Sequence, residues 1–344
     1  MISLSGLTLT EIEELLSPLP RFRAAQIFKW IAKGVNSIDE MTNIPSDLRA
    51  DLKERFCLYS SKVDDIHKDG ETKKFVISLE DGARIESVLL NDGKNRLTAC
   101  ISTQAGCPAG CIFCKTGSLG FKRNLNCAEI IEQFLHLRLN SQGKDSGHII
   151  DNIVVMGMGE PLLNLPNLRK AIEILNHKKG INFSLRRITI STCGICDGLN
   201  DFAQNGPYVR LALSLTTADE SLRRKLMPIT KANPLDKVKE QLLLLRKKSG
   251  DRITLEVPLL GRINTREEDA KSIADFAKGL DCIVNIIPWN PVAGFAFEGK
   301  PLQEPDKKET EDFARLLENY GLKVTMRLHK GRSVMGACGQ LGVV

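Results

Sequence analysis

The sequence predicts an α/β protein built around a full or partial TIM-like barrel, with a small helical module at its amino terminus. At 344 residues the chain is long enough for one barrel of about 250 residues and a smaller module. Beyond residue 95, apolar β-branched runs alternate with helical stretches, as a parallel sheet wound with helices requires. Between residues 9 and 55 the apolar residues recur at helical spacing instead.

The spacing of apolar residues in the first part of the chain predicts a helical module followed by a hairpin. Breaks at Gly34 and at Asn43-Ile-Pro45 separate short amphipathic segments. Two alternating runs between residues 73 and 90 then flank Glu80-Asp-Gly82, a good hairpin turn. We therefore expect a helical accessory domain over 1–60, a β-hairpin linker over 61–94 and the barrel over 95–344.

The barrel is expected to consist of repeated strand and helix units. Strands are predicted near 96–102, 151–156, 187–192, 209–215, 252–258, 283–288 and 322–327. Helices are predicted at about 126–139, 165–177, 236–248, 266–279 and 306–319. The Gly- and Pro-rich stretch 293–305 is the best candidate for a mobile loop. The motifs described below follow predicted strands, where α/β barrels build their sites.

The composition predicts a soluble, cytoplasmic protein. There are 48 Lys and Arg against 42 Asp and Glu, a net charge of +6, which favours nucleic acid only mildly. One basic cluster, His329-Lys330-Gly331-Arg332, lies shortly before Cys338 and is placed to bring a polyanion to that thiol. Ten cysteines without a signal segment indicate a reducing compartment. No apolar run approaches the roughly 20 residues that span a bilayer, so no membrane partner is expected.

Three cysteines in one loop predict a metal centre. Cys107-Pro-Ala-Gly-Cys111-Ile-Phe-Cys114 has the spacing C-x3-C-x2-C. Three thiolates leave one iron of a [4Fe-4S] cluster open to an outside ligand such as S-adenosylmethionine, whereas a fourth would close the site. The alternative is a zinc site completed by a distant Cys or His, although zinc ligands usually come as C-x2-C pairs. Cys193 and Cys196 form such a spacing, which we interpret as ordinary small core cysteines.

With its flanks, residues 100–117, the cysteine loop resembles the RlmN/Cfr family of radical S-adenosylmethionine (radical SAM) RNA methyltransferases. The cysteine loop alone would indicate only a radical enzyme. Cys100 before the loop and Cys338 near the carboxyl end indicate this particular family. Further matching pieces are Phe22-Arg-Ala-Ala-Gln-Ile-Phe-Lys-Trp30, Val155-Met-Gly-Met-Gly-Glu-Pro-Leu-Leu-Asn164, Leu226-Met-Pro-Ile229, Ile286-Ile-Pro-Trp-Asn-Pro291 and Gly336-Ala-Cys-Gly-Gln-Leu341. The resemblance implies a partial (β/α)6 radical SAM barrel. It also implies that the helical accessory domain and the basic tail clamp RNA.

The resemblance implies that Cys107, Cys111 and Cys114 ligate the cluster and that a second set of residues binds S-adenosylmethionine. That set consists of Gly159, Glu160, Ser191, Ser214, Thr216 and Asn290. The family usually reads Ser-Leu-His where this chain reads Ser214-Leu-Thr216. Threonine keeps a hydroxyl but loses the imidazole, so a backbone contact at position 216 is the one that would remain.

The resemblance also gives roles to two thiols and a carboxylate. It implies that Cys338 carries the methyl group as S-methylcysteine, because C2 of adenine is too electron-poor to attack a sulfonium methyl directly. The S-methyl group becomes a carbon radical and adds to the base, and Cys100 then releases the product through a transient disulfide with Cys338. Glu86, in Arg84-Ile-Glu-Ser87, would accept the proton from C2. Taken alone, each of the two cysteines is more often an ordinary thiol without a catalytic role, and Glu86 is equally consistent with a solvent-facing strand residue.

The implied substrates are an adenosine of 23S rRNA and an adenosine in tRNA. Pro288-Trp-Asn-Pro291 resembles the RlmN version and favours C2 over C8, the position that Cfr-type members methylate. A flavodoxin-type electron donor and a monomeric state are also expected. Two other classes stay open: a zinc-stabilised RNA-binding protein without catalysis, and a radical enzyme that acts on a small molecule.

Overall fold

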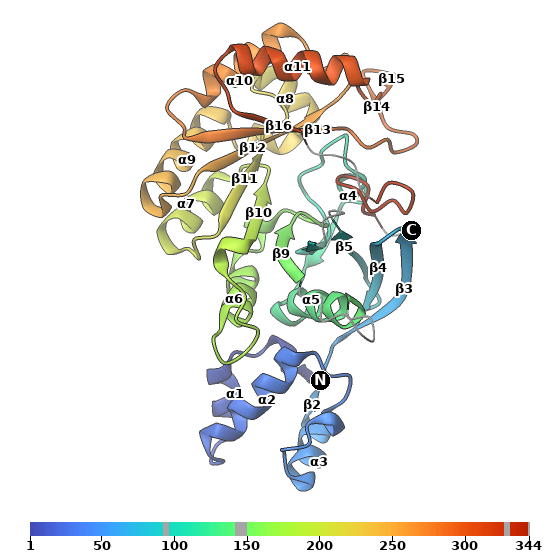
Figure 1. Cartoon of the computed structure of the whole chain (residues 1–344), viewed down its shortest axis with the longest axis vertical. Helices are drawn as coiled ribbons and strands as arrows, with labels where there is room; N and C mark the ends of the chain where they lie inside the picture. Colours follow the sequence, from blue (N-terminus) through green and yellow to red (C-terminus); the bar gives the residue numbers. More distant parts are fainter. Residues whose placement is uncertain (92–95, 142–149, 327–330, 343–344) are drawn as a thin grey trace.

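The amino-terminal module is helical. The computed structural model describes residues 1–91, 96–141, 150–326 and 331–342. Three helices, α1 (Leu9–Leu15), α2 (Arg21–Lys33) and α3 (Ser46–Arg55), lie at the end of the molecule drawn at the bottom of Figure 1. Short strands β1 (Ile2–Ser3) and β2 (Phe56–Cys57) pair in parallel. Helix α1 begins at a capping box between Thr8 and Glu11, and α2 ends at left-handed Gly34.

A ten-stranded sheet forms the centre of the rest of the described chain, in the order β16-β13-β12-β11-β10-β9-β6-β5-β4-β3. Its parallel part consists of β6 (Leu97–Cys100), β9 (Ile150–Val155), β10 (Ile188–Thr192), β11 (Arg210–Ser214), β12 (Ile253–Leu259), β13 (Cys282–Pro288) and β16 (Val324–Met326). All seven predicted barrel strands are therefore found, although residue 327 lies outside the described residues. Because the parallel strands do not close into a ring, the barrel is partial.

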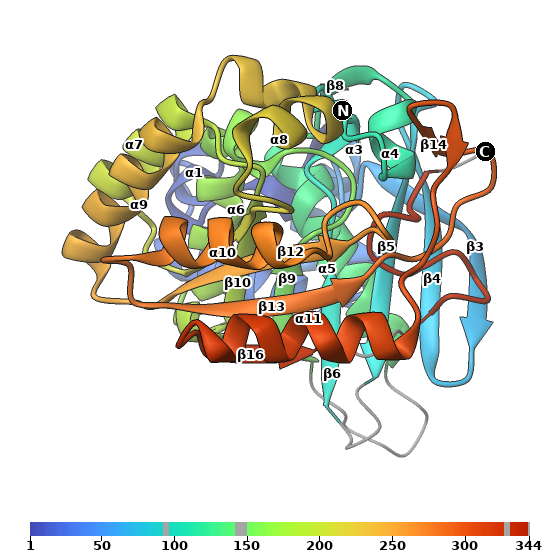
Figure 2. The ribbon, with the colours of Figure 1, turned by 90° about the horizontal axis from the view of Figure 1, so that it is seen from above.

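Helices cover the outside of the sheet (Figure 2). The five predicted ones are α5 (Cys127–Ser141), α6 (Leu165–Asn176), α9 (Leu235–Ser249), α10 (Glu267–Ala277) and α11 (Lys307–Asn319). Two further helices, α7 (Cys196–Asn205) and α8 (Glu220–Leu226), were not predicted from the sequence. Helix α7 contains weak helix formers such as Gly198 and Asn200, so its stability comes from packing against α9. Short 3-10 turns span Leu4–Gly6, Ile38–Glu40, Pro161–Leu163, Leu185–Arg187 and Pro228–Lys231.

The expected hairpin consists of β4 (Thr72–Leu79) and β5 (Arg84–Asn91), but it is part of a larger unit. A third strand, β3 (Ser61–Asp69), pairs with β4, and β5 pairs antiparallel with β6. The hairpin thus continues the barrel sheet. The predicted boundaries at residues 60 and 94 stay predictions. The stretch 293–305 contains a small hairpin of β14 (Ala296–Phe297) and β15 (Lys300–Pro301).

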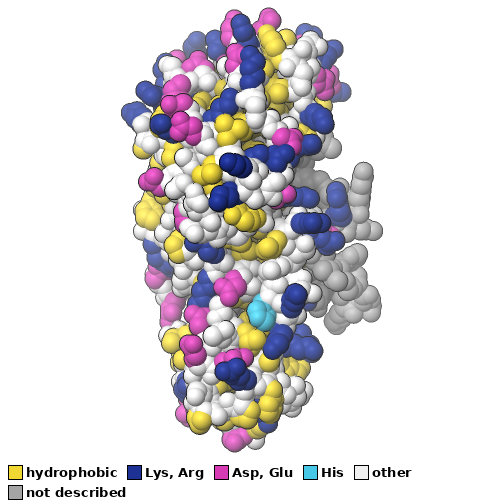
Figure 3. Space-filling view, turned by 90° about the vertical axis from the view of Figure 1, so that its left-hand side faces the viewer, with side chains coloured by type: hydrophobic (Ala, Val, Ile, Leu, Met, Phe, Trp, Pro, Cys, Tyr) yellow, Lys and Arg dark blue, Asp and Glu magenta, His cyan; other side chains and the backbone are white. Residues whose placement is uncertain are grey.

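The surface over the helices is mixed in charge. On the face in Figure 3, Lys and Arg side chains are interspersed with Asp and Glu along the length of the molecule. Such a mixture is typical of a solvated face and by itself marks no binding site. Among the described residues, no helix has both the length and the apolar character needed to cross a membrane.

Candidate functional site

The three loop cysteines line one pocket at the carboxyl ends of the barrel strands. Strand β7 (Gln104–Gly106), which pairs with β8 (Phe121–Asn124), leads into the loop, and the short helix α4 (Lys115–Ser118) follows it. The loop turns tightly because Gly110 has a φ of 66°, and a Cβ on Gly117 would lie 2.9 Å from the backbone oxygen of Cys111. A backbone hydrogen bond of 3.0 Å from Ile112 to Leu226 fixes the loop to α8.

The donor chemistry of this loop fits an iron-sulfur cluster. Burial raises the pKa of Cys107 to about 12 and also raises the pKa values of Cys111 and Cys114, so all three are protonated thiols at neutral pH. All ten cysteines are free of disulfides. No trio of His, Cys, Asp or Glu side chains in the described ranges is arranged around a single metal ion. In a cubane cluster each thiolate would bind a different iron, so the three sulfur atoms lie farther apart than the ligands of a single metal ion.

Five of the six residues predicted to bind S-adenosylmethionine line the same pocket: Gly159, Glu160, Ser191, Ser214 and Asn290. Glu160 is buried and accepts hydrogen bonds from the backbone of Leu162 (3.0 Å) and Cys193 (2.8 Å) and from the hydroxyl of Thr192 (2.7 Å). Burial raises the pKa of Glu160, and these hydrogen bonds oppose the rise. The carboxylate is therefore held in one position.

Thr216 differs from the other predicted residues because it is not among those that line the pocket. It is fully buried and has a φ of 64°, which is costly for a β-branched residue. Its backbone bonds to Glu256 and to the Asn264 side chain, while its hydroxyl makes no hydrogen bond within the described chain. The side chain at position 216 is therefore buried beneath the loop that follows Ser214 and does not line the pocket.

The sequence analysis missed Glu256, which lies in β12 and lines the pocket. Its carboxylate accepts a hydrogen bond of 2.7 Å from the hydroxyl of Ser191. One signal was present in the sequence, because Glu256 is a single acid inside the apolar run Leu255-Glu-Val-Pro-Leu-Leu260. A charge within a buried strand usually has a partner or a function. Cys193, interpreted as a core cysteine, is buried but also lines the pocket.

The described part of the tail brings Cys338 to the cysteine loop. Cys338 lines the pocket, and its charge contributes to raising the pKa of Cys114. Its carbonyl accepts a hydrogen bond of 3.0 Å from Asn290, and the next carbonyl, of Gly339, accepts one of 2.7 Å from the backbone of Lys115. The tail is therefore bound across the mouth of the pocket.

The basic cluster before Cys338 is described only in part, and its expected contact with a polyanion stays a prediction. Arg332 bonds to the Asn290 side chain and forms an ion pair with Glu304, so it anchors the tail. His329 and Lys330 lie outside the described residues.

Cys100 and Glu86 lie near this pocket without lining it. Cys100, 6% exposed, is held in the sheet opposite Val88 and Val154. Glu86 is 3% exposed and forms an ion pair of 2.8 Å with Lys74. Its other carboxylate oxygen accepts a hydrogen bond of 2.7 Å from the backbone of Gly342 in the tail. Glu86 borders a separate hollow that the tail also borders.

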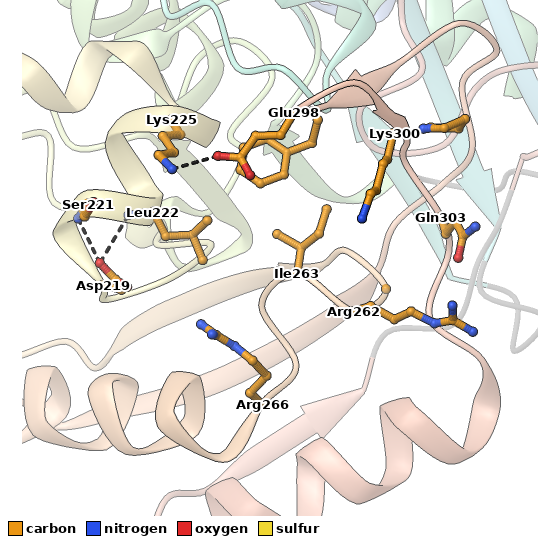
Figure 4. A pocket seen from close by; sticks show the side chains of 13 residues that line it. Asp219, Ser221, Leu222, Lys225, Arg262, Ile263, Arg266, Glu298, Lys300 and Gln303 are labelled. Carbon is orange, nitrogen blue, oxygen red and sulfur yellow. Dashed lines mark hydrogen bonds and ion pairs between the residues drawn. The ribbon is translucent and has the colours of Figure 1, made fainter.

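A larger hollow of about 640 Å³ lies at the same rim of the barrel (Figure 4). It is formed by the segments that follow β11 and β12 and by the β14–β15 hairpin. Lys225 in this hollow pairs with Glu298 at 2.7 Å, and Arg266 pairs with Asp269. Two further basic residues, Arg262 and Lys300, form no ion pair within the described ranges.

Comparison with known proteins agrees with this fold. Residues 101–277 match the family model of the Radical SAM superfamily, and residues 2–58 match that of the Ribosomal RNA large subunit methyltransferase N-terminal domain. The fold and the site thus define a radical SAM protein with an accessory amino-terminal domain. The predicted fold class is confirmed.

Whole-chain relatives give the particular family. A probable dual-specificity RNA methyltransferase RlmN of Treponema denticola is 51% identical over 341 residues, covering 99% of this chain and 95% of that protein. A Thermotoga protein of the same name is 43% identical over 326 residues, covering 94% and 92%. The crystal structure of a radical SAM methyltransferase from Sphaerobacter thermophilus has a TM-score of 0.93 and 35% identity, and the match covers 99% of both chains. The chain belongs to the RlmN family of radical SAM RNA methyltransferases, which confirms the resemblance.

Proposed function

We propose that this protein methylates C2 of adenosine in 23S rRNA and in tRNA through an S-methylcysteine on Cys338. The observation that carries the proposal is the presence of Cys338 in the pocket of Cys107, Cys111 and Cys114. A methyl-carrying thiol has to lie where S-adenosylmethionine and the cluster meet. The relatives' name, dual-specificity RNA methyltransferase, supports an RNA substrate of two kinds.

The residues of the pocket supply binding and orientation. Cys107, Cys111 and Cys114 would hold the cluster, and Gly159, Ser191, Ser214, Asn290 and Glu256 would surround the cofactor. When bound, the cluster provides the electron that cleaves S-adenosylmethionine, which is the source of the methyl group and of the hydrogen-abstracting radical. Glu160 would accept from the cofactor's ammonium group. A backbone contact from Thr216 is still proposed.

Two further residues act on the nucleotide or on Cys338. Glu86 would accept the proton from C2, and its ion pair with Lys74 holds the carboxylate in place. Cys100 would attack Cys338 to release the product. Cys100 is held in the sheet, and a disulfide with Cys338 requires that the two Cα atoms lie within about 7 Å of each other. A flavodoxin-type donor and a monomeric enzyme complete the proposal.

The experiment is mass spectrometry of nucleosides from 23S rRNA and tRNA after incubation with anaerobically reconstituted protein, reductant and S-adenosylmethionine. The wild type is expected to form 2-methyladenosine, identified by co-elution with a standard. Cys338→Ala is expected to form none, while Cys282→Ala, which changes a thiol outside the pocket, stays active.

Other outcomes would contradict parts of the proposal. Formation of 8-methyladenosine would assign the Cfr-type reaction. Product from Cys338→Ala would exclude the methyl-carrier role. A colourless protein that binds zinc and RNA but forms no product would favour the zinc-stabilised RNA-binding class, because zinc is spectroscopically silent and an iron-sulfur cluster is brown.

A further inference from the structure

Arg223, in helix α8, is a fully buried cation that forms no ion pair with an acid of the described residues. Its side chain is 0% exposed. The guanidinium donates to the carbonyls of Leu215 (3.0 Å), Ser214 (3.2 Å) and Cys193 (2.7 Å), and to the hydroxyl of Thr230 (2.8 Å). All four acceptors are neutral, and no carboxylate of the described residues forms an ion pair with it.

Such an arrangement is costly unless an anion compensates the charge. Removing a cation from water is unfavourable, and hydrogen bonds to neutral oxygens compensate only part of the loss. Burial lowers the pKa of Arg223, yet a guanidinium stays protonated in proteins. The fold therefore keeps a positive charge in a buried position. The acid Glu220 acts on this charge without forming an ion pair with it, so a further negative partner nearby would stabilise it.

The charge lies directly behind the pocket of the loop cysteines. Two of its acceptors, Ser214 and Cys193, belong to residues that line this pocket. The positive charge of Arg223 also acts on Cys111, where it opposes the rise in pKa that burial causes. The hydrogen bond from Ile112 to Leu226 attaches the cysteine loop to the same helix, so the separation between loop and cation is fixed.

We propose that Arg223 is a positioning residue whose buried charge stabilises the anionic cluster and raises its reduction potential. This inference rests on the proposed function, because it requires a [4Fe-4S] cluster held by three thiolates. The cluster accepts one electron from the reductant and gains one negative charge. A fixed cation behind the pocket favours that reduced state, and net charge is among the factors that set cluster potentials.

The test is the midpoint potential of the reconstituted cluster, measured by titration with dithionite and detection of the reduced cluster by electron paramagnetic resonance. Arg223→Gln is expected to lower the midpoint by 59 mV or more, which corresponds to a tenfold loss of the reduced-to-oxidised ratio at a fixed potential. Arg223→Lys keeps the charge and is expected to stay near the wild-type value. Arg224→Gln, which changes the exposed neighbour that pairs with Glu220, is the matched control and should leave the midpoint unchanged.

A second variant keeps the arginine in place. Thr230→Asp puts a carboxylate at the position that accepts from Arg223 and should also lower the midpoint. Wild-type midpoints in both Arg223→Gln and Thr230→Asp would overturn the proposal. If Arg223→Gln loads no cluster but Arg223→Lys does, the requirement is for charge, as proposed. If neither loads, the guanidinium is needed for its hydrogen bonds and the proposal fails. These titrations contain no RNA. A failure of the proposed methylation therefore does not change the measured midpoints and can be distinguished from a failure of this proposal.

Discussion

Ser191 and Glu256 come from different strands and together form one part of the pocket wall. Ser191 was expected from its position after a strand, while Glu256 belongs to a different strand that carries no known motif. Their hydrogen bond of 2.7 Å places a carboxylate oxygen on the pocket wall. A carboxylate accepts well from the hydroxyls of a ribose, so the pair is suited to hold the sugar of the proposed cofactor.

Glu256→Gln is therefore expected to weaken S-adenosylmethionine binding by at least about tenfold, because a charge-assisted hydrogen bond contributes about 1.5–3 kcal/mol. The measurement is titration calorimetry of the cluster-loaded protein under anaerobic conditions. Glu240→Gln changes an exposed acid of α9 that lies outside the pocket and should bind like the wild type. Equal affinities for all three proteins would remove Glu256 from the proposed binding set.

The thiols of the cysteine loop predict a pH dependence of stability. Burial raises the folded-state pKa of Cys107 from 9.0 to about 12, so the folded apo protein favours the thiol more than the unfolded chain does. This contribution is present below about pH 9 and is lost as the pH rises toward 12.

The melting temperature of the apo protein is accordingly expected to fall from pH 8 to pH 10 more steeply than that of the loaded protein, whose loop cysteines are already thiolates. Thermal unfolding at closely spaced pH values measures the difference. Parallel curves for the two forms would contradict the assignment of these cysteines as ligands.

The segments after β11 and β12 and the β14–β15 hairpin form one hollow with four basic side chains at the rim of the barrel (Figure 4). Arg262 and Lys300 form no ion pair within the described part of the chain, so they are available to phosphates. If an RNA base is held in the pocket, nucleotides that flank it can run along this rim. We therefore expect the hollow to bind the RNA backbone.

Replacing both Arg262 and Lys300 with Ala should weaken RNA binding and reduce the slope of log affinity against log salt by about 1–2. Fluorescence anisotropy with a labelled 23S rRNA fragment at several salt concentrations measures it. Lys271→Ala, in α10 and outside the hollow, is the control. An unchanged slope in the double variant would exclude the hollow as a phosphate site.

At the scale of the whole molecule, one buried carboxylate joins the amino-terminal module to the barrel. Glu132 in α5 is 0% exposed and accepts from the hydroxyls of Ser3 and Ser5, each at 2.7 Å, and from the backbone of Ser60 at 2.8 Å. The hydroxyl of Ser61 bonds to its other oxygen. Segments from both ends of the module thus converge on one side chain.

Glu132→Ala should lower the free energy of unfolding by about 3 kcal/mol, because several buried donors would lose their acceptor. Urea unfolding measures the change, and limited proteolysis should show earlier cleavage within residues 1–60. Glu173→Ala, an exposed acid of α6, serves as the comparison. If the two variants unfold alike, Glu132 does not hold the module in place.

Features of this protein that depend on residues close together in the chain could be predicted from the sequence. The alternation of strands and helices predicted every parallel strand of the barrel, because burial between helices imposes continuous apolar runs. The three cysteines of the loop were also evident, since they lie within eight consecutive residues. Helix α7 was missed because its own residues favour a helix only weakly and α9 provides the contact that stabilises it.

Features that depend on contacts between distant segments become visible only in the folded chain. It put Cys338 beside the cysteine loop, turned Glu256 into the pocket and buried Arg223 behind it without an ion pair to any acid of the described residues. Local spacing does not specify these positions, because burial and electrostatic environment arise from elements that meet only after the sheet has formed. The sequence thus determined the kind of chemistry, and the folded chain decided which charges surround it.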